Sequence, residues 1–229
     1  MKLPEESNRF SDKEPLHEQV YQYLKWSLIT GEYAPNEAIS IRPIAANLAI
    51  STMPVREALK RLVSERAIVS SGNKTYRVNL LEPKRVADLF FIRSNLEGIA
   101  TELATPLLTI GQMNRLEELA SKMDKMEQNN CCQDFREYLT FNYNFHFIIY
   151  TATKSIELVS IIEGLWAQVG PFLAASVRET GITPSSPHTH LQIVDALRVR
   201  DAELARKLME EDVSWGTEVF NRIDNKEVN

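Results

Sequence analysis

The sequence predicts a mainly α-helical protein, with an N-terminal winged helix-turn-helix followed by an all-α antiparallel helical bundle. Residues 16–62 carry apolar residues at helical spacing in three short segments, and two short β-like runs flank residues 71–74. From residue 83 onward the pattern is helical, with no convincing strand. Because 229 residues are enough for two domains, we expect a disordered start at 1–14, a winged helix-turn-helix at 15–80 and a helical bundle at 81–229.

The first helix is predicted from apolar residues on one face, and Gly31 and Pro35 end it. The stripe consists of Leu16, Val20, Tyr23, Leu24 and Leu28. A short second helix follows in "IRPIAANLAIS", with Ile44, Ala45 and Leu48 facing inward.

The third helix begins at "STMPVREALKRL", where the Ser51 hydroxyl is placed to cap the first turn and Pro54 falls where a missing N–H costs little. A buried stripe of Val55, Ala58, Leu59 and Leu62 leaves the opposite face to solvent. In a helix-turn-helix, the N-terminal residues of such a helix enter the major groove of DNA. Arginine reads guanine by two parallel hydrogen bonds, so Arg56 is the base-reading candidate.

The other basic side chains of this domain are expected to contact phosphates, which set the register without reading sequence. The alternative is a solvated basic face on a structural unit. The predicted DNA-binding residues are Arg42, Ser51, Thr52, Met53, Arg56, Lys60, Gly72 and Lys74, with Arg61 and Arg77 as further phosphate contacts.

Beyond a linker near residues 80–83, six helices are predicted near 83–104, 110–128, 131–151, 154–179, 187–199 and 201–223, the fourth with a break near Gly170. Such a series forms an antiparallel bundle.

Charge is uneven along the chain. Residues 1–80 hold 11 Lys and Arg against 9 Asp and Glu, whereas residues 81–229 hold 15 against 22. A mildly basic front on an acidic body suits a small nucleic-acid-binding module joined to a larger domain. The polar N-terminus lacks the apolar core of a signal peptide, and the sequence has no run of about 18 apolar residues that would predict a membrane span. We interpret Cys131 and Cys132 as free thiols, which are typical of a reducing compartment. We therefore expect a cytoplasmic protein without a membrane partner.

The stretch "AISIRPIAANLAISTMPVREALKRLVSERAIV" resembles the helix-turn-helix signature of the GntR family of bacterial transcription regulators, with its "PVREAL.RL" core. The helices that follow resemble the FCD effector domain of the FadR-type subgroup, so the resemblance covers about residues 15–223. It implies operator contacts from Arg42 and Arg56 and a wing glycine at Gly72. The family usually has arginine where this chain has Thr52, which implies a different operator preference.

FCD domains commonly bind a divalent metal through an aspartate, a histidine four residues later, and two further histidines. The resemblance aligns this set with Asn142, His146, His190 and Asp212, so that asparagine replaces the aspartate and aspartate replaces the third histidine. One carboxylate and two imidazoles could still bind zinc, nickel or manganese. The alternative is that His146 is a core histidine with a hydrogen-bonded neighbour.

Arg93 lies on an apolar stripe of its predicted helix, and a buried guanidinium needs a partner. Glu97, one turn later, could be a structural partner. In similar FCD domains this arginine grips a carboxylate ligand, which is the functional alternative. The predicted effector-binding residues are Arg93, Glu97, Tyr143 and Gln168.

These features predict a ligand-responsive transcription regulator, a homodimer on a palindromic operator, acting as a repressor released by a small organic acid. Two other classes stay open. One is a metal-dependent enzyme using His146, His190 and Asp212, although no nucleophile and base pair is evident. The other is a nucleoid protein that binds DNA without sequence preference.

Overall fold

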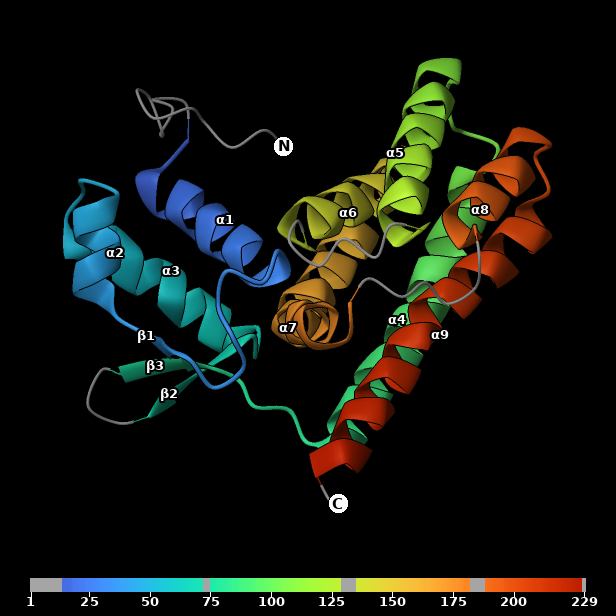
Figure 1. The fold of residues 1–229 in the computed structure, drawn as a ribbon. Helices are drawn as coiled ribbons and strands as arrows, with labels where there is room; N and C mark the ends of the chain where they lie inside the picture. The colour runs from blue at the N-terminus through green and yellow to red at the C-terminus, as the bar shows by residue number, and fades with distance from the viewer. Residues whose placement is uncertain (1–13, 72–74, 129–134, 182–187, 228–229) are drawn as a thin grey trace. The chain divides into compact units, whose positions relative to one another are not determined.

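The computed structural model describes residues 14–71, 75–128, 135–181 and 188–227. The chain divides into two compact units (Figure 1). The first comprises Met1–Leu80 with Trp166–Pro171, and the second comprises Leu81–Leu165 with Phe172–Asn229. The predicted disordered start, apart from Glu14, and both cysteines lie outside the described residues.

Up to Leu80, the described part of the first unit contains three helices and a small sheet, and the unit also includes Trp166–Pro171 from a later helix. The helices are α1 (Leu16–Ile29), α2 (Ile41–Asn47) and α3 (Thr52–Ser64). Helix α1 packs on α3 and α3 on α2, so that the three apolar faces share one core. The buried face of α1 contains Tyr21, whereas Tyr23 of the predicted stripe is only half-buried.

The predicted orientation of α3 is confirmed. Its buried residues are Val55, Ala58, Leu59 and Leu62. Ser51 stands at the N-cap position with extended backbone, but its side chain makes no capping hydrogen bond within the described residues, so the predicted hydroxyl cap is wrong.

The sheet has three antiparallel strands in the order β1-β3-β2: β1 (Ala38–Ile39), β2 (Ile68–Ser71) and β3 (Thr75–Val78). The predicted hairpin is formed, with Ser71 opposite Thr75. The sequence did not predict β1, which pairs Ile39 with Tyr76. Gly72 and Lys74 fall between β2 and β3, outside the described residues.

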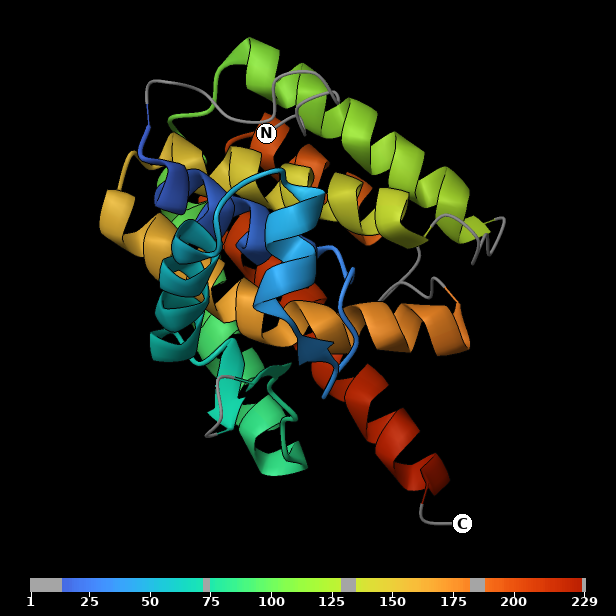
Figure 2. The ribbon, with the colours of Figure 1, turned by 90° about the vertical axis from the view of Figure 1, so that its left-hand side faces the viewer.

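The second unit is all helical in its described part, as predicted (Figures 1 and 2). Helix α7 runs unbroken past Gly170 with Pro171 inside it, so the predicted break is wrong. The helices are α4 (Pro83–Ala104), α5 (Ile110–Gln128), α6 (Phe135–Ala152), α7 (Ile156–Thr180), α8 (Thr189–Arg198) and α9 (Ala202–Glu227).

Helix α7 is long and apolar enough, between Ile156 and Glu179, to pass a length and hydropathy test for a membrane span. Its mean hydropathy there is 1.4, and 39% of the window is buried. A core helix of a globular protein passes the same test, so this is weak evidence for a membrane.

Helices α4 and α9 lie side by side, and two glycines allow the close approach. A Cβ at Gly98 would lie 2.6 Å from Cγ of Glu210, and one at Gly216 would lie 2.1 Å from Cε1 of Phe90. Phe90 is buried, so its ring has little room to move aside. The α4–α9 contact holds residues from both ends of the chain's second unit in one core.

Gly216→Ala is therefore expected to lower the free energy of unfolding by ~1–3 kcal/mol, because the new methyl group overpacks against Phe90. Gly164→Ala is the control, since a Cβ there meets nothing within 4 Å in the middle of α7. It should stabilise the protein by up to about 1 kcal/mol. Chemical denaturation followed by circular dichroism measures both, and equal effects would contradict the packing argument.

Candidate functional site

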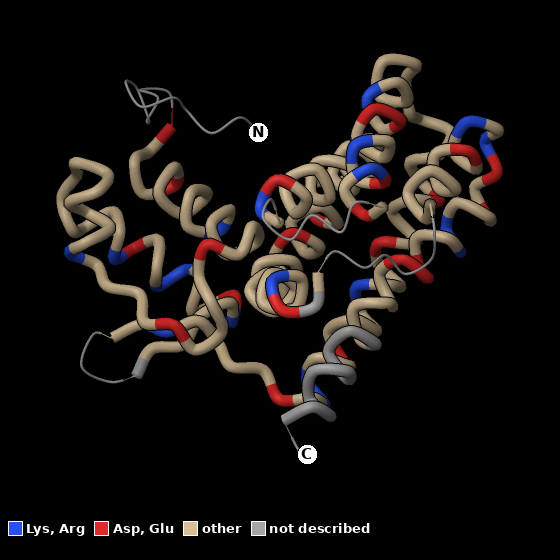
Figure 3. Tube along the Cα trace, in the orientation of Figure 1, with Lys and Arg blue, Asp and Glu red and all other residues tan. Residues whose placement is uncertain are grey.

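The N-terminal end of α3 carries the residues predicted to read DNA. Thr52 and Met53 are exposed, with Met53 at 61% of its maximal accessibility, and Arg56 is half-exposed on the same side. Arg42 opens α2 and is exposed, while Lys60 is exposed beside Glu57, 2.9 Å away. Figure 3 shows the Lys and Arg positions of α2 and α3 in blue. The predicted residues that the structure describes are therefore accessible to a partner.

Two of the predicted phosphate contacts have partners inside the first unit. The Arg61 guanidinium lies 2.6 Å from Glu18 and stacks 3.6 Å from the ring centroid of Tyr21. Nη1 of Arg77 donates to the backbone carbonyl of Asn36 at 2.9 Å. These contacts favour a structural role for Arg61 and Arg77 over the predicted phosphate contact.

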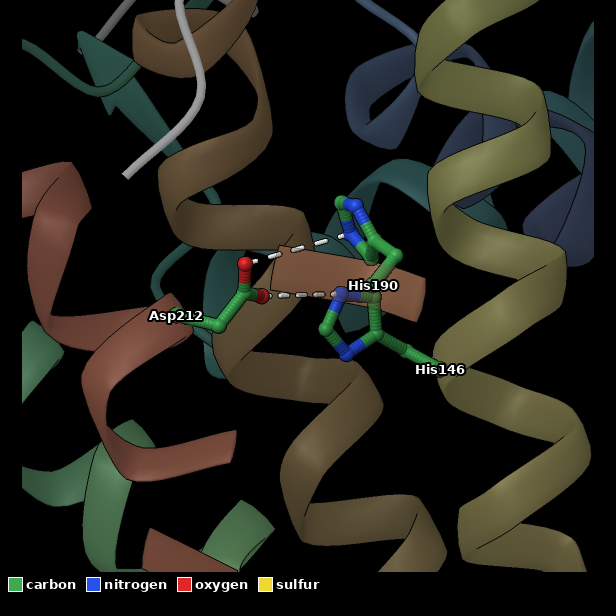
Figure 4. A group of neighbouring side chains, drawn as sticks. All are labelled: His146, His190 and Asp212. Carbon is green, nitrogen blue, oxygen red and sulfur yellow. Dashed lines mark ion pairs between the residues drawn. The ribbon is translucent and has the colours of Figure 1, made fainter. Parts of the chain in front are cut away.

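The second unit brings His146, His190 and Asp212 together from α6, α8 and α9 (Figure 4). One ligand atom from each lies within 4.8 Å of the others. Nε2 of His146 is 3.3 Å from Oδ2 of Asp212, and Nε2 of His190 is 3.9 Å from Oδ1. Both imidazoles are buried, so this group is enclosed by the helical core.

Asn142 joins the same group as predicted, because its Oδ1 lies 3.1 Å from Nε2 of His190. It precedes His146 by one helical turn on α6, which places both side chains on one face. Glu127, which the sequence reasoning missed, lies 3.8 Å from the other ring nitrogen of His190 and accepts a hydrogen bond from Tyr138. His190 is thus flanked by a polar group at each ring nitrogen.

The electrostatics of the group suit a cation. Burial lowers the pKa of His190 to about 4, which keeps the imidazole neutral, the form that binds metals. Burial alone would raise the pKa of Asp212, but His190 and His146 outweigh it and hold that pKa below its ordinary value. Two imidazoles and one carboxylate form a set of ligands to which zinc, nickel or manganese can bind. The residues present therefore fit a divalent metal ion.

A hydrogen-bonded chain continues from His146 into the core. Nδ1 of His146 lies 2.9 Å from the Tyr150 hydroxyl, which donates to Oε2 of Glu97 at 2.5 Å. Nε of Arg93 donates to Oε1 of the same carboxylate at 2.7 Å. Burial, and then Glu97, raise the pKa of Tyr150 well above its ordinary value, so the phenol keeps its proton.

The predicted effector residues are only partly brought together. Arg93 pairs with Glu97, so the structural alternative for Arg93 is formed. Tyr143 donates to Glu163 at 2.9 Å and stacks on Phe147, with ring centroids 4.0 Å apart. Gln168 is buried within Trp166–Pro171, the part of α7 that belongs to the first unit. An effector role for these four residues stays a prediction.

Tyr150 is the other residue that sequence reasoning missed, although a signal exists for it. Asn142, His146 and Tyr150 follow one another at intervals of four in "NYNFHFIIY", so they share one face of α6. A tyrosine one turn after a candidate ligand histidine is a simple pattern for a hydrogen-bonded partner. Glu127 offers no comparable signal, because its nearest predicted ligand lies on another helix.

An exposed helix-turn-helix tip in one unit and a ligand-type cluster in a second, helical unit are the features expected of a DNA-binding transcriptional regulator. Residues 16–78 match the gntR family of bacterial regulatory proteins, and residues 88–214 match the FCD domain. The chain belongs to the gntR family and carries an FCD domain, which confirms the resemblance. It is a family of transcription regulators and not of enzymes.

The chain is similar over most of its length to other such regulators. It is 28% identical over 211 residues to the HTH-type transcriptional regulator McbR of Escherichia coli (strain K12), which covers 89% of this chain and 94% of McbR. It is 24% identical to the HTH-type transcriptional repressor GlaR of the same organism, covering 82% of this chain and 88% of GlaR.

Solved structures show the same fold. The structure of E. coli McbR/YncC superposes with a TM-score of 0.78 at 27% identity, covering 94% of this chain and all of that one (100%). A putative transcriptional regulator GntR from Rhodococcus sp. RHA1 gives a TM-score of 0.70 at 18% identity, covering 90% and 97%. The predicted fold class is confirmed.

His146→Ala is expected to remove most bound metal, from about one ion per chain to a small fraction, because the cluster loses an imidazole ligand. His188→Ala is the control: this histidine is exposed and lies 2.5 Å from Asp124, outside the group of His146, His190 and Asp212. Elemental analysis of the purified proteins measures both. Wild-type protein without stoichiometric metal would overturn the metal site itself.

Proposed function

We propose that this regulator is a cytoplasmic, homodimeric repressor that leaves its operator when a small carboxylate binds in the helical domain. The observation that carries the proposal is that one unit has a half-exposed Arg56 at the tip of α3, while the other has a group of two buried histidines, His146 and His190, with Asp212. Relatives named as repressors, such as GlaR and RspR of E. coli, support repression over activation.

Sequence-specific binding rests on a few side chains at the start of α3. Arg56 can donate two parallel hydrogen bonds to O6 and N7 of a guanine, and the exposed Thr52 and Met53 can touch a thymine methyl group. Arg42 at the start of α2 and Lys60 further along α3 are placed for phosphates or a base edge. Two such tips in a homodimer would read two half-sites of a palindrome.

A divalent metal held by Asn142, His146, His190 and Asp212 would supply a fixed positive charge for a carboxylate effector. Zinc, nickel and manganese all accept such a set of two imidazoles and oxygens. The metal would act as a binding element and not as a catalyst, since regulation needs only that the effector binds one arrangement of the dimer better than another. Arg93 could grip the effector only by sharing its guanidinium with Glu97, to which it is already bonded.

Arg56→Ala should weaken the discrimination between operator and random DNA by ~1–3 kcal/mol per half-site, because the bidentate base contact is gone. Lys60→Ala is the control, since loss of a phosphate contact weakens binding to all sequences about equally. A competition gel shift, using sites enriched from a random DNA pool, measures both.

Unchanged operator preference in Arg56→Ala would refute its role as the reader. Equal competition by random DNA in the wild-type protein would favour a nucleoid protein without sequence preference. Release of the operator by a small acid that also raises the melting temperature would identify the effector.

A further inference from the structure

The hydrogen bonds around Tyr150 have only one consistent direction. Its hydroxyl has one proton, and three possible acceptors lie near it: Oε2 of Glu97 at 2.5 Å, Nδ1 of His146 at 2.9 Å and the thioether of Met209 at 3.3 Å. The carboxylate is the strongest acceptor and the closest, while a thioether accepts weakly. Glu97 is fully buried, its other oxygen accepts a hydrogen bond from Arg93, and an ionised carboxylate can only accept. The Tyr150 proton therefore points to Glu97.

The direction of that bond fixes the next one. With its proton on Glu97, the Tyr150 oxygen can only accept from the ring nitrogen 2.9 Å away, so Nδ1 of His146 must carry a proton. The other ring nitrogen, Nε2, faces Oδ2 of Asp212 at 3.3 Å. When this ring is neutral, Nε2 therefore keeps a lone pair, which a metal ion bound at the cluster could accept.

We infer that Glu97 and Tyr150 are positioning residues that keep the His146 proton on Nδ1 and present its Nε2 lone pair to a metal ion. The inference rests on the metal site of the proposed function. Without the hydrogen bonds from Glu97 and Tyr150, the favoured neutral form of His146 carries its proton on Nε2 and donates it to Asp212. In that hydrogen bond, Nε2 of His146 and the Asp212 carboxylate are bonded to each other and cannot both bind a metal ion. The hydrogen bonds from Glu97 and Tyr150 therefore keep these two ligand atoms available.

Arg93 holds Glu97, at the far end of this series of hydrogen bonds from His146. It lies one helical turn before Glu97 on α4, and both side chains are buried, with exposures of 3% and 0%. A carboxylate held between a guanidinium and a phenol has little freedom to rotate. Three helical positions on α4 and α6 thus determine the orientation of one metal ligand, as neighbouring hydrogen bonds do in other protein metal sites.

Tyr150→Phe tests the inference, because it removes one oxygen and keeps the ring. Affinity for zinc alone and for manganese alone, measured on the full chain by competition with a chelator, should fall ~10- to 100-fold. Tyr21→Phe is the matched control: Tyr21 is also buried and donates to a glutamate, Glu65 at 2.7 Å, but in the first unit. It should leave metal affinity unchanged.

A second measurement reads the proton directly and needs no metal. Long-range ¹H–¹⁵N spectra of histidine-labelled, metal-free wild-type protein, recorded across a pH series, should show the neutral His146 ring with its proton on Nδ1 and none on Nε2, assigned by the loss of its signals in His146→Gln. In Tyr150→Phe the proton should move to Nε2. This spectroscopic change would not follow from a general loss of stability, and the wild-type spectrum decides even where the variant fails to fold.

The outcomes separate the two hypotheses. Wild-type metal affinity retained in Tyr150→Phe, or an Nδ1 of His146 without a proton in the wild type, overturns the positioning role and leaves the metal site standing. Wild-type protein that binds neither zinc nor manganese overturns the metal site and the positioning role together. Weaker binding in Tyr150→Phe with the predicted proton shift, and unchanged binding in Tyr21→Phe, supports the inference.

Discussion

The buried carboxylate of Glu97 is the constraint on which the second unit depends. A carboxylate without water is costly unless charge and hydrogen bonds compensate it. Glu97 has an exposure of 0%, with Arg93 at one oxygen and Tyr150 at the other. Its position therefore ties α4 to α6, while Gly98, the next residue, lets α9 approach α4. The same few residues fix the core and the orientation of His146.

The sequence predicted what depends on local periodicity and on short motifs. The buried stripe of α3 followed from Val55, Ala58, Leu59 and Leu62 alone, and so did the exposure of Thr52 and Met53. The six helices of the second unit were found for the same reason, because each buries one face. Asn142 and His146 were placed on one face of α6 by their spacing, and the structure brings Asp212 and His190 to them.

What the sequence did not predict depends on contacts between distant residues. The strand β1 has only two residues, Ala38 and Ile39, and is defined by its pairing with β3. The ion pair of Arg61 with Glu18 was not foreseen, because the two residues lie 43 positions apart. Tyr150 meets Glu97 across 53 residues, and Glu127 meets His190 from another helix. No periodicity records such pairs, because each helix reports only which of its faces is buried.

The altered ligand set has a spatial logic that its order in the sequence hides. Relative to the ligand pattern that the FCD resemblance implies, this chain has Asn142 on α6 and Asp212 on α9, so the proposed set keeps one carboxylate. In this position Asp212 lies 3.3 Å from one imidazole and 3.9 Å from the other, while Asn142 keeps an oxygen at His190. The Asp212 carboxylate thus lies close to both rings, as the proposed cation site requires. In this position the Asp212 carboxylate also competes for the proton of His146. The direction of the hydrogen bond from Tyr150 to Glu97, which keeps that proton on Nδ1, is therefore more important here than in a site with three histidines.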